Sequence, residues 1–217
     1  MSSKKKLIAD LLFGVQLIGA VALCGSQFFR LLETTKGQLL SMFLGYQAFL
    51  VLHLVLAIGA YRAEPSRITQ QTIFVYIMWI VLAGSNAVAI LLNGGYKWSQ
   101  NDTRFVVLAA IGTIVVFAYA SLSGIGIKNP MCKGFLAMIF KALPQFVMAF
   151  EVIEKGGAGV PTIAVVAGNI TIITRIIQVG LAIREAGWER NRTWLFASET
   201  VNELSWAAVT VVWVIKL

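Results

Sequence analysis

Four stretches of the sequence contain no Asp, Glu, Lys or Arg and are long enough to cross a lipid bilayer as α-helices. They are Leu11–Phe29, Gly37–Tyr61, Ile68–Tyr96 and Phe105–Ile127. A spanning helix needs about 20 residues, because each residue adds about 1.5 Å along a hydrocarbon core about 30 Å thick. Each stretch therefore predicts one membrane-spanning helix.

Three further apolar runs contain a few charges, and they raise the expected number of helices to seven. They are Lys133–Phe150 with Lys141, Val160–Ile183 with Arg175, and Thr193–Ile215 with Glu199 and Glu203. Only 13% of the residues are charged, against about 25% in a typical soluble domain. We therefore expect an all-α, polytopic membrane protein with short loops and membrane lipid as its surroundings.

The net charge of +8 is spread over the predicted loops, where Lys and Arg anchor membrane proteins, and it does not indicate a nucleic-acid partner. The N-terminus and the even-numbered connections together carry ten basic residues, whereas the other side carries six. Positive loops favour the cytoplasm, so this count predicts a cytoplasmic N-terminus. The first apolar run has a poor cleavage site and is predicted to be a helix, not a signal peptide.

No set of residues in the sequence indicates catalysis, a cofactor or a metal. Cys24 and Cys132 have neither pairing nor metal-ligand spacing. The glycine-rich connection at 155–159 is not followed by a Walker pattern. A retinal protein needs a lysine deep in its seventh helix, whereas this chain has only Lys216, near its end. We therefore expect no enzyme, no cofactor and no metal site.

Polar residues recur in the same order in the two ends of the chain. Gln27 and Gln145 are 118 positions apart, and His53 and Arg175 are 122 apart. Three more pairs follow the same order: Glu33 with Glu151, Gln47 with Asn169, and Thr72 with Thr193. Internal repeats of this kind are common in membrane transporters. The pattern predicts two repeats of three helices, at 1–97 and 129–217.

A single helix at Thr103–Ile127, within the linker 98–128, separates the two predicted repeats. Three helices leave the chain on the far side of the membrane, and a fourth returns it, so the two repeats are expected to be parallel. This linker helix has little polar content and is expected to face lipid. The predicted architecture is thus three helices, one linker helix and three helices.

The sequence resembles the PQ-loop superfamily, which includes SWEET sugar transporters, PnuC vitamin transporters, cystinosin-like exporters and KDEL receptors. The resemblance rests on Pro144-Gln145, on Ser26-Gln27 at the matching place, and on the arrangement of helices. Ser26 departs from the motif, so the hinge that the resemblance implies at Gln27, Pro144 and Gln145 is expected mainly in the second repeat.

For a SWEET-like member, the resemblance also implies a solute site between the two repeats. An asparagine from the third helix of each repeat would contact the solute, with aromatic side chains nearby. The candidates are Asn86 and Asn202, with Trp79 and Trp206. The two asparagines are 116 positions apart, about one helical turn from the repeat spacing. The tryptophans have packing within the bundle as their alternative role.

Arg175 is the most informative single residue, because a charged side chain inside a membrane needs a partner or water. Arg175 and Glu203 lie at similar distances from the turn between the last two helices, so they are expected to form an ion pair. Glu199 lies one turn from Glu203. This group indicates either a fixed salt bridge or a site for a substrate anion or a proton.

Four other polar side chains in the predicted helices have two interpretations each. His53 is either a hydrogen-bonded core residue or a proton carrier. Gln47 and Asn169 either bind a solute or hydrogen-bond each other across the repeat axis. Lys141 either extends toward an interface or reaches a carbonyl oxygen or a Glu.

Taken together, the sequence predicts a transporter that moves a small polar solute, such as a sugar, amino acid or vitamin, by alternating access. The alternative is a seven-helix receptor of the KDEL-receptor kind, in which Arg175 would hold a carboxylate and no solute would cross. Proton coupling and assembly as a homo-oligomer are left open.

Overall fold

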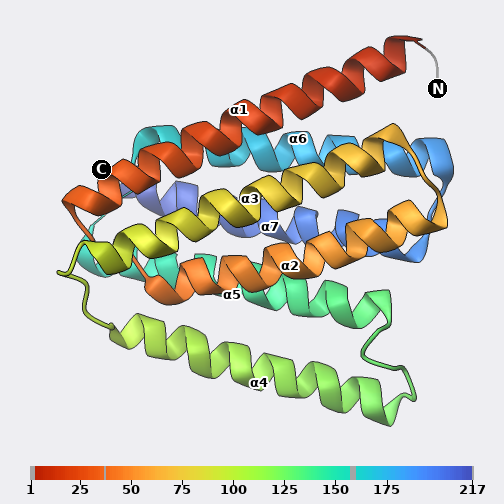
Figure 1. The fold of residues 1–217 in the computed structure, drawn as a ribbon. Helices are drawn as coiled ribbons and strands as arrows, with labels where there is room; N and C mark the ends of the chain where they lie inside the picture. The colour runs from red at the N-terminus through yellow and green to blue at the C-terminus, as the bar shows by residue number, and fades with distance from the viewer. Residues whose placement is uncertain (1–2, 37, 157–159, 217) are drawn as a thin grey trace.

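The computed structural model describes residues 3–36, 38–156 and 160–216, and within these ranges it contains seven α-helices and no other regular element (Figure 1). The connection at 155–159 falls partly outside the described residues, at 157–159. The helices are α1 (Ser3–Glu33), α2 (Leu40–Ala63), α3 (Arg67–Leu92), α4 (Gln100–Leu122), α5 (Pro130–Lys155), α6 (Thr162–Ala186) and α7 (Arg190–Ile215). The predicted all-α class is confirmed.

Six of these helices, α1 to α6, are long and apolar enough to cross a membrane. α7 does not meet this description, although it is 26 residues long. It carries Arg190, Arg192, Glu199 and Glu203, which lower its hydropathy. Large apolar side chains are exposed along most of the helices, as expected for surfaces that face lipid. The chain is therefore a multi-pass membrane protein.

Hydrogen-bonded caps fix the starts of α3 and α4. Ser66 and Thr69 form a capping box at α3, and Ser99 and Asp102 form one at α4. The second box moves the start of α4 to Gln100, three residues before the predicted start at Thr103. The predicted end at Ile127 was also wrong, because the chain turns through Gly124, which has a positive φ of 64°.

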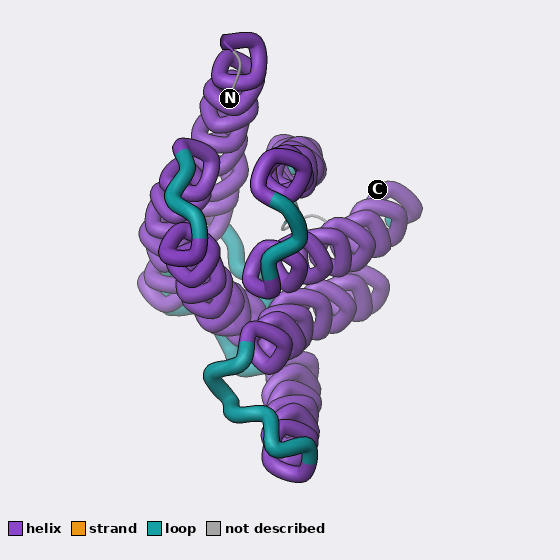
Figure 2. Tube along the Cα trace, turned by 90° about the vertical axis from the view of Figure 1, so that its right-hand side faces the viewer, coloured by secondary structure: helices purple, strands orange, loops and turns teal. Residues whose placement is uncertain are grey.

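The helices pack in an order that differs from their order in the sequence. α3 packs against both α1 and α2, and α7 packs against both α5 and α6 (Figures 1 and 2). These contacts form two groups of helices, α1 to α3 and α5 to α7. The two groups meet where α1 packs against α6 and where α2 packs against α5. α4 lies at one edge of the bundle, where it packs against α5 and, less extensively, α2. Most of its surface is therefore left to lipid, as the sequence predicts.

Pro144 lies inside α5, which is continuous from Pro130 to Lys155. A proline has no N–H, so the carbonyl oxygen of Phe140, four residues earlier, loses its helical partner. Gly45 of α2 lies against this region: a Cβ added to it would lie 3.1 Å from that oxygen. The missing side chain at Gly45 thus allows α2 to approach α5 closely where the backbone of α5 is loosened.

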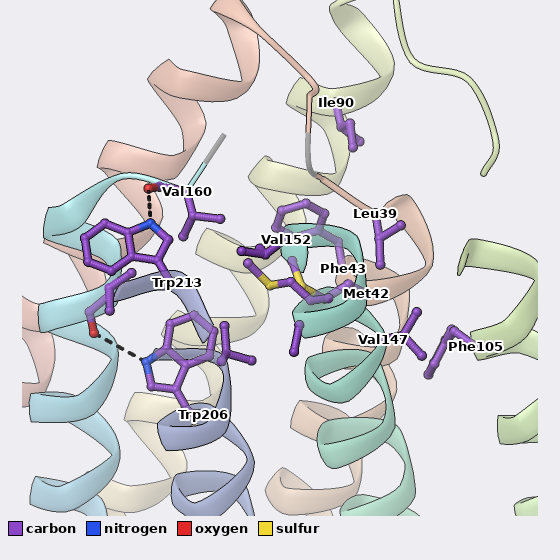
Figure 3. Close-up of a cluster of buried hydrophobic side chains, with 14 of the residues drawn as sticks. Leu39, Met42, Phe43, Ile90, Phe105, Val147, Val152, Val160, Trp206 and Trp213 are labelled. Carbon is purple, nitrogen blue, oxygen red and sulfur yellow. Dashed lines mark hydrogen bonds between the residues drawn. The ribbon is translucent and has the colours of Figure 1, made fainter. Parts of the chain in front are cut away.

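The bundle has two chemically different ends. α1, α3, α5 and α7 begin at one end, which we call the N-terminal end, and finish at the opposite end. A large apolar cluster fills the opposite end (Figure 3). In this cluster the indole of Trp213 donates to the Val160 carbonyl at 3.2 Å, and that of Trp206 donates to the Val165 carbonyl at 3.4 Å.

Asp102 fastens the connection before α4 to the start of α2. It is fully buried, and its carboxylate accepts from the backbone N–H of Ser41 and of Ser99, each at 2.9 Å. The hydroxyl of Tyr96 also donates to Asp102 and accepts from the N–H of Leu40. Partial burial and the bond to Asp102 hold the pKa of Tyr96 above its ordinary value, so the hydroxyl stays protonated as a donor.

We expect Tyr96→Phe to destabilise the protein, because it removes the donor to Asp102 and the acceptor for the Leu40 N–H. Leaving buried polar groups without partners costs about 1–3 kcal/mol. Thermal unfolding of the purified protein in detergent measures this loss. Tyr119→Phe is the matched control, since Tyr119 is half exposed on α4. Equal melting temperatures for the two variants would contradict the anchoring role of Tyr96.

Candidate functional site

A cavity of about 80 Å³ lies between the two groups of helices. Its wall combines charged, amide and aromatic side chains, which is the composition expected of a solute site. The main polar and aromatic lining residues are Gln16, Tyr46, Phe49, Tyr76, Trp79, Asn86, Lys141, Arg175, Glu199, Asn202 and Trp206. All six helices of the two groups contribute to the wall, whereas α4 does not.

Arg175 lies in the cavity wall, is only 4% exposed, and does not form the predicted ion pair with Glu203. Its guanidinium lies over the ring of Tyr76, 4.6 Å from the centroid, and its Nη1 donates to Gln178 at 3.1 Å. The prediction compared only the depths of the two residues along their helices. The rotation of α7 about its axis places Glu199, and not Glu203, in the wall.

Glu199 is held by three partners, although it is only 3% exposed. The hydroxyl of Tyr76 donates to Oε1 at 2.7 Å, and the amide of Asn202 donates to Oε2 at 2.9 Å. His53 Nδ1 lies 3.3 Å from Oε1. A carboxylate inside a bundle needs such donors, since leaving it unpaired is costly. Tyr76 is therefore a residue of the candidate site that the sequence analysis missed.

His53 is fully buried and does not line the cavity. Its Nδ1 is 3.0 Å from the hydroxyl of Tyr76, and its Nε2 is 2.6 Å from that of Ser198. These contacts agree with the hydrogen-bonded core interpretation. They also place His53 directly beside Glu199. If His53 carries a proton, its exchange partners are therefore Glu199, Tyr76 and Ser198.

Asn86, Asn202, Trp79 and Trp206 all line the cavity, as predicted for a site between the repeats. The mismatch of one turn between the two asparagines therefore does not separate them from the site. Asn86 is 2% exposed, and its Oδ1 has no hydrogen-bond partner among the described residues. Trp206 packs directly over α6, where Gly168 leaves room for its indole.

Gln47 and Asn169, which the sequence assigns either to the solute or to each other, lie outside the cavity wall. They do not bond to each other either. Gln47 donates to the Ile80 carbonyl at 3.2 Å and so joins α2 to α3. Asn169 donates to Thr210 at 3.1 Å and so joins α6 to α7. Each of the two residues thus links the second and third helices of its own group.

Glu203, a second predicted solute contact, also lies outside the cavity wall. Its Oε2 is buried and, within the part of the chain that the structure describes, has no hydrogen-bond partner. Glu203 thus lies one helical turn from Glu199 on α7 without a hydrogen bond from Oε2 to the group formed around Glu199.

The predicted hinge residues are buried beside the cavity. Gln145 is fully buried, donates to Asn202 at 3.1 Å and accepts from the Ser205 hydroxyl, so it ties α5 to α7 next to Pro144. Gln27, its predicted counterpart in α1, is also buried, and its Nε2 has no partner among the described side chains and backbone. The two glutamines are therefore not equivalent in their bonding.

Lys141 reaches the cavity, contrary to both interpretations of its sequence position. Its Nζ lies 3.6 Å from the centroid of the Tyr46 ring and 5.1 Å from that of Phe49. Such contacts stabilise a cation by about 0.5–2 kcal/mol. Lys141 thus neither extends to an interface nor bonds a carboxylate. These aromatic neighbours belong to α2, so the residues around Lys141 in the sequence could not indicate them.

A chain of amide side chains runs from Arg175 toward the N-terminal end. Gln178 accepts from Gln16 at 2.8 Å and donates to Gln71 at 3.4 Å. Gln71 in turn donates to Asp10 at 2.7 Å. Sequence reasoning missed this chain as part of the site, although a glutamine within an apolar helix is itself a signal of a polar interior.

Arg67 ends this chain with a two-pronged ion pair to Asp10, with both contacts at 2.9 Å. Both side chains are partly exposed at the N-terminal end of the bundle. The polar chain thus lies between the cavity and this end, and the apolar cluster that contains Trp206 and Trp213 lies toward the opposite end.

The described residues hold no group of three or more His, Cys, Asp or Glu side chains that could hold a metal ion. Cys24 and Cys132 are both buried and free. Cys24 contributes to the cavity wall, while Cys132 packs in an apolar cluster beside α4. The chemistry of the site is therefore that of its charged, amide and aromatic groups.

We expect Tyr76→Phe to lower the stability of the protein by about 1–3 kcal/mol, because Glu199 and His53 would each lose a buried partner. Tyr61→Phe is the matched control, since the Tyr61 hydroxyl accepts only an exposed bond from Gln70. Thermal unfolding in detergent measures the difference. A Tyr76→Phe variant as stable as the control would contradict the role of Tyr76 in holding Glu199.

No protein-family model, no curated protein and no solved structure matches this chain. The resemblance to the PQ-loop superfamily therefore stays a hypothesis based on Pro144-Gln145, Ser26-Gln27 and the order of the helices. The fold shows a multi-pass membrane bundle, and the cavity with its charges is the basis for assigning a function.

Proposed function

We propose that this protein is a membrane transporter that moves a small polar solute by alternating access. The observation that carries the proposal is the cavity between the two groups of helices, with Arg175, Glu199, Asn86 and Asn202 in its wall. Charged and amide groups are costly inside a membrane bundle, and they typically mark the path of a substrate or ion.

The packing of the helices supports a duplicated architecture of three helices, a linker helix and three helices. α3 packs between α1 and α2 in the way that α7 packs between α5 and α6. The contact of α1 with α6 has its counterpart in the contact of α5 with α2. A twofold axis that relates α1 to α5 and α2 to α6 predicts that these two contacts correspond. We extend the proposal to membership of the PQ-loop superfamily and to α7 as a seventh spanning helix.

The burial of the polar side chains of α7 supports the proposal of a seventh span. Glu199 and Asn202 point into the bundle, where other helices satisfy them. A helix can cross a membrane with such residues if they face protein and not lipid. Seven spans also put the two termini on opposite sides of the membrane. We propose that the N-terminus is cytoplasmic, as the count of basic residues in the loops predicts.

Alternating access requires the two closures of the cavity to open in turn. At the N-terminal end the closure consists of the amide chain and the pair between Asp10 and Arg67. At the opposite end it is the apolar cluster that contains Trp206 and Trp213. Pro144 loosens α5 beside Gln145, and rocking of the two groups about this region would open one closure at a time.

A receptor that binds a solute without moving it is the second candidate. Arg175 favours it as well, because a buried guanidinium in a cavity wall suits a carboxylate in either kind of protein. Binding therefore does not distinguish the two functions, whereas movement of solute across a membrane does.

The test is solute flux in proteoliposomes that contain the purified protein. Swelling and tracer assays with a panel of small sugars, amino acids and carboxylates would identify the solutes that cross. For a solute that crosses, we expect Arg175→Gln to reduce the initial rate at least about tenfold, since a charge-assisted bond contributes about 1.5–3 kcal/mol.

Arg184→Gln is the matched control, because it removes an exposed arginine from the same helix and should leave the rate unchanged. Binding of a panel member without flux would favour the receptor. Equal rates for the wild-type protein and Arg175→Gln would contradict the assignment of the cavity as the path.

A further inference from the structure

The negative charge in the cavity wall has more hydrogen-bond partners than the two positive charges have. The wall contains one carboxylate, Glu199, and two cations, Lys141 and Arg175. Both oxygens of Glu199 already accept hydrogen bonds, from Tyr76 and Asn202, and His53 lies beside them. Glu199 therefore has little capacity left to bind a cationic group of a solute.

The two cations, in contrast, have no carboxylate oxygen within 4 Å among the described residues. Arg175 makes one side-chain hydrogen bond, to Gln178, out of the five that a guanidinium can donate. Lys141 is stabilised by the faces of Tyr46 and Phe49, which accept no ordinary hydrogen bond. Both cations therefore have unused capacity for an anion.

The two cations also lie at similar distances along their helices. Arg175 is eleven residues from the end of α6 at Ala186, and Lys141 is eleven residues from the start of α5 at Pro130. Both of these ends belong to the N-terminal end of the bundle. At about 1.5 Å per residue, each cation lies roughly 16 Å from that end of its own helix. Both line the same cavity, so an anion there would meet both.

Two acceptors in the same wall lack donors. Asn86 Oδ1 and Gln16 Oε1 are buried and have no hydrogen-bond partner in the described chain. Gln16 is 1% exposed, and it and Asn86 both line the cavity. A buried acceptor without a donor is unfavourable, so a solute that brought an O–H or N–H to either oxygen would relieve that cost.

We propose that the solute is a small carboxylate that also carries a hydrogen-bond donor, such as a hydroxy acid or an amino acid. This inference rests on the proposed transport function and deepens it. Arg175 and Lys141 bind the carboxylate, and Asn86 or Gln16 accepts from the donor. The cavity of about 80 Å³ is far smaller than the roughly 300–1,000 Å³ of typical ligand sites, so the solute has few heavy atoms.

The test compares four solutes of nearly equal size by their effect on the thermal stability of the full chain in detergent, at constant ionic strength. Lactate has both features, lactamide lacks the charge, propionate lacks the donor, and alanine replaces the hydroxyl with an ammonium group. A ligand that binds the folded state raises the melting temperature with its concentration. We expect lactate or alanine to stabilise the protein, and lactamide and propionate to have much weaker effects.

The inference would be overturned if lactamide stabilised the protein as strongly as lactate does. It would also be overturned if none of the four solutes stabilised the protein. Sodium nitrate is tested in the same way as a fifth compound. If nitrate stabilised the protein as strongly as lactate does, any small anion would suffice, and the inference would again be overturned. The difference between lactate and alanine identifies the donor as a hydroxyl or an ammonium group.

Two pairs of variants test the assigned residues. Arg175→Gln should weaken the binding of the stabilising solute at least about tenfold, whereas Arg184→Gln should not. Lys141→Met and its exposed control Lys128→Met form the second pair. Unchanged binding in both Arg175→Gln and Lys141→Met would overturn the assignment. The comparison of solutes on the wild-type protein does not depend on the folding of any variant.

Flux measurements on the same solutes separate this inference from the transport function. Uptake of neutral solutes without binding of lactate or alanine would overturn the carboxylate inference and leave transport standing. Binding of lactate or alanine without flux of any solute would keep the carboxylate site and overturn transport.

Discussion

The structure depends on the need to satisfy polar groups inside an apolar bundle. The carboxylate of Glu199 shows this most directly, because water is largely excluded from its surroundings. Its partners come from α2, α3 and α7, through His53, Tyr76 and Asn202. Gln145 extends the network to α5 by its bond to Asn202. One buried charge thus determines how four helices meet at the centre of the molecule.

The same constraint explains why the two ends of the cavity differ. Toward the N-terminal end, Gln16, Gln71 and Gln178 satisfy one another and lead to the exposed pair of Asp10 with Arg67. Toward the opposite end a large apolar cluster packs together (Figure 3), and the buried Asp102 beside it is satisfied by Tyr96, Ser41 and Ser99. A polar closure separates by exchanging its bonds for bonds to water, whereas an apolar closure separates by exposing surface to water. The two closures therefore respond differently to salt and temperature.

The sequence was sufficient to predict the helices, because the apolar runs leave few alternatives inside a membrane. It also identified Arg175, Asn86, Asn202, Trp79 and Trp206 as residues of the site, since polar and large aromatic groups stand out in such runs. It was not sufficient to pair them. Depth along a helix can be counted from the sequence, whereas rotation about the axis depends on packing.

The failed pairings follow from that missing rotation. Arg175 was matched to Glu203, and Gln47 to Asn169, from their positions alone. Tyr76 and Gln178 were missed, and Lys141 was assigned other surroundings, for the same reason: their contacts are with residues on other helices. Capping moved the start of α4 by three residues, since Ser99 and Asp102 bond to each other's backbone. Such errors are local, and they leave the order and number of helices unchanged.

The two groups of helices share a packing pattern but divide the chemistry of the site between them. All three charged residues of the cavity wall, Lys141, Arg175 and Glu199, belong to α5, α6 and α7. Each cation lies over a tyrosine of the other group: Arg175 over Tyr76 and Lys141 over Tyr46. Rocking of the groups would break both contacts, each of which contributes about 0.5–2 kcal/mol. An anion held between the cations would offset that loss, so binding would favour the movement that the transport proposal requires.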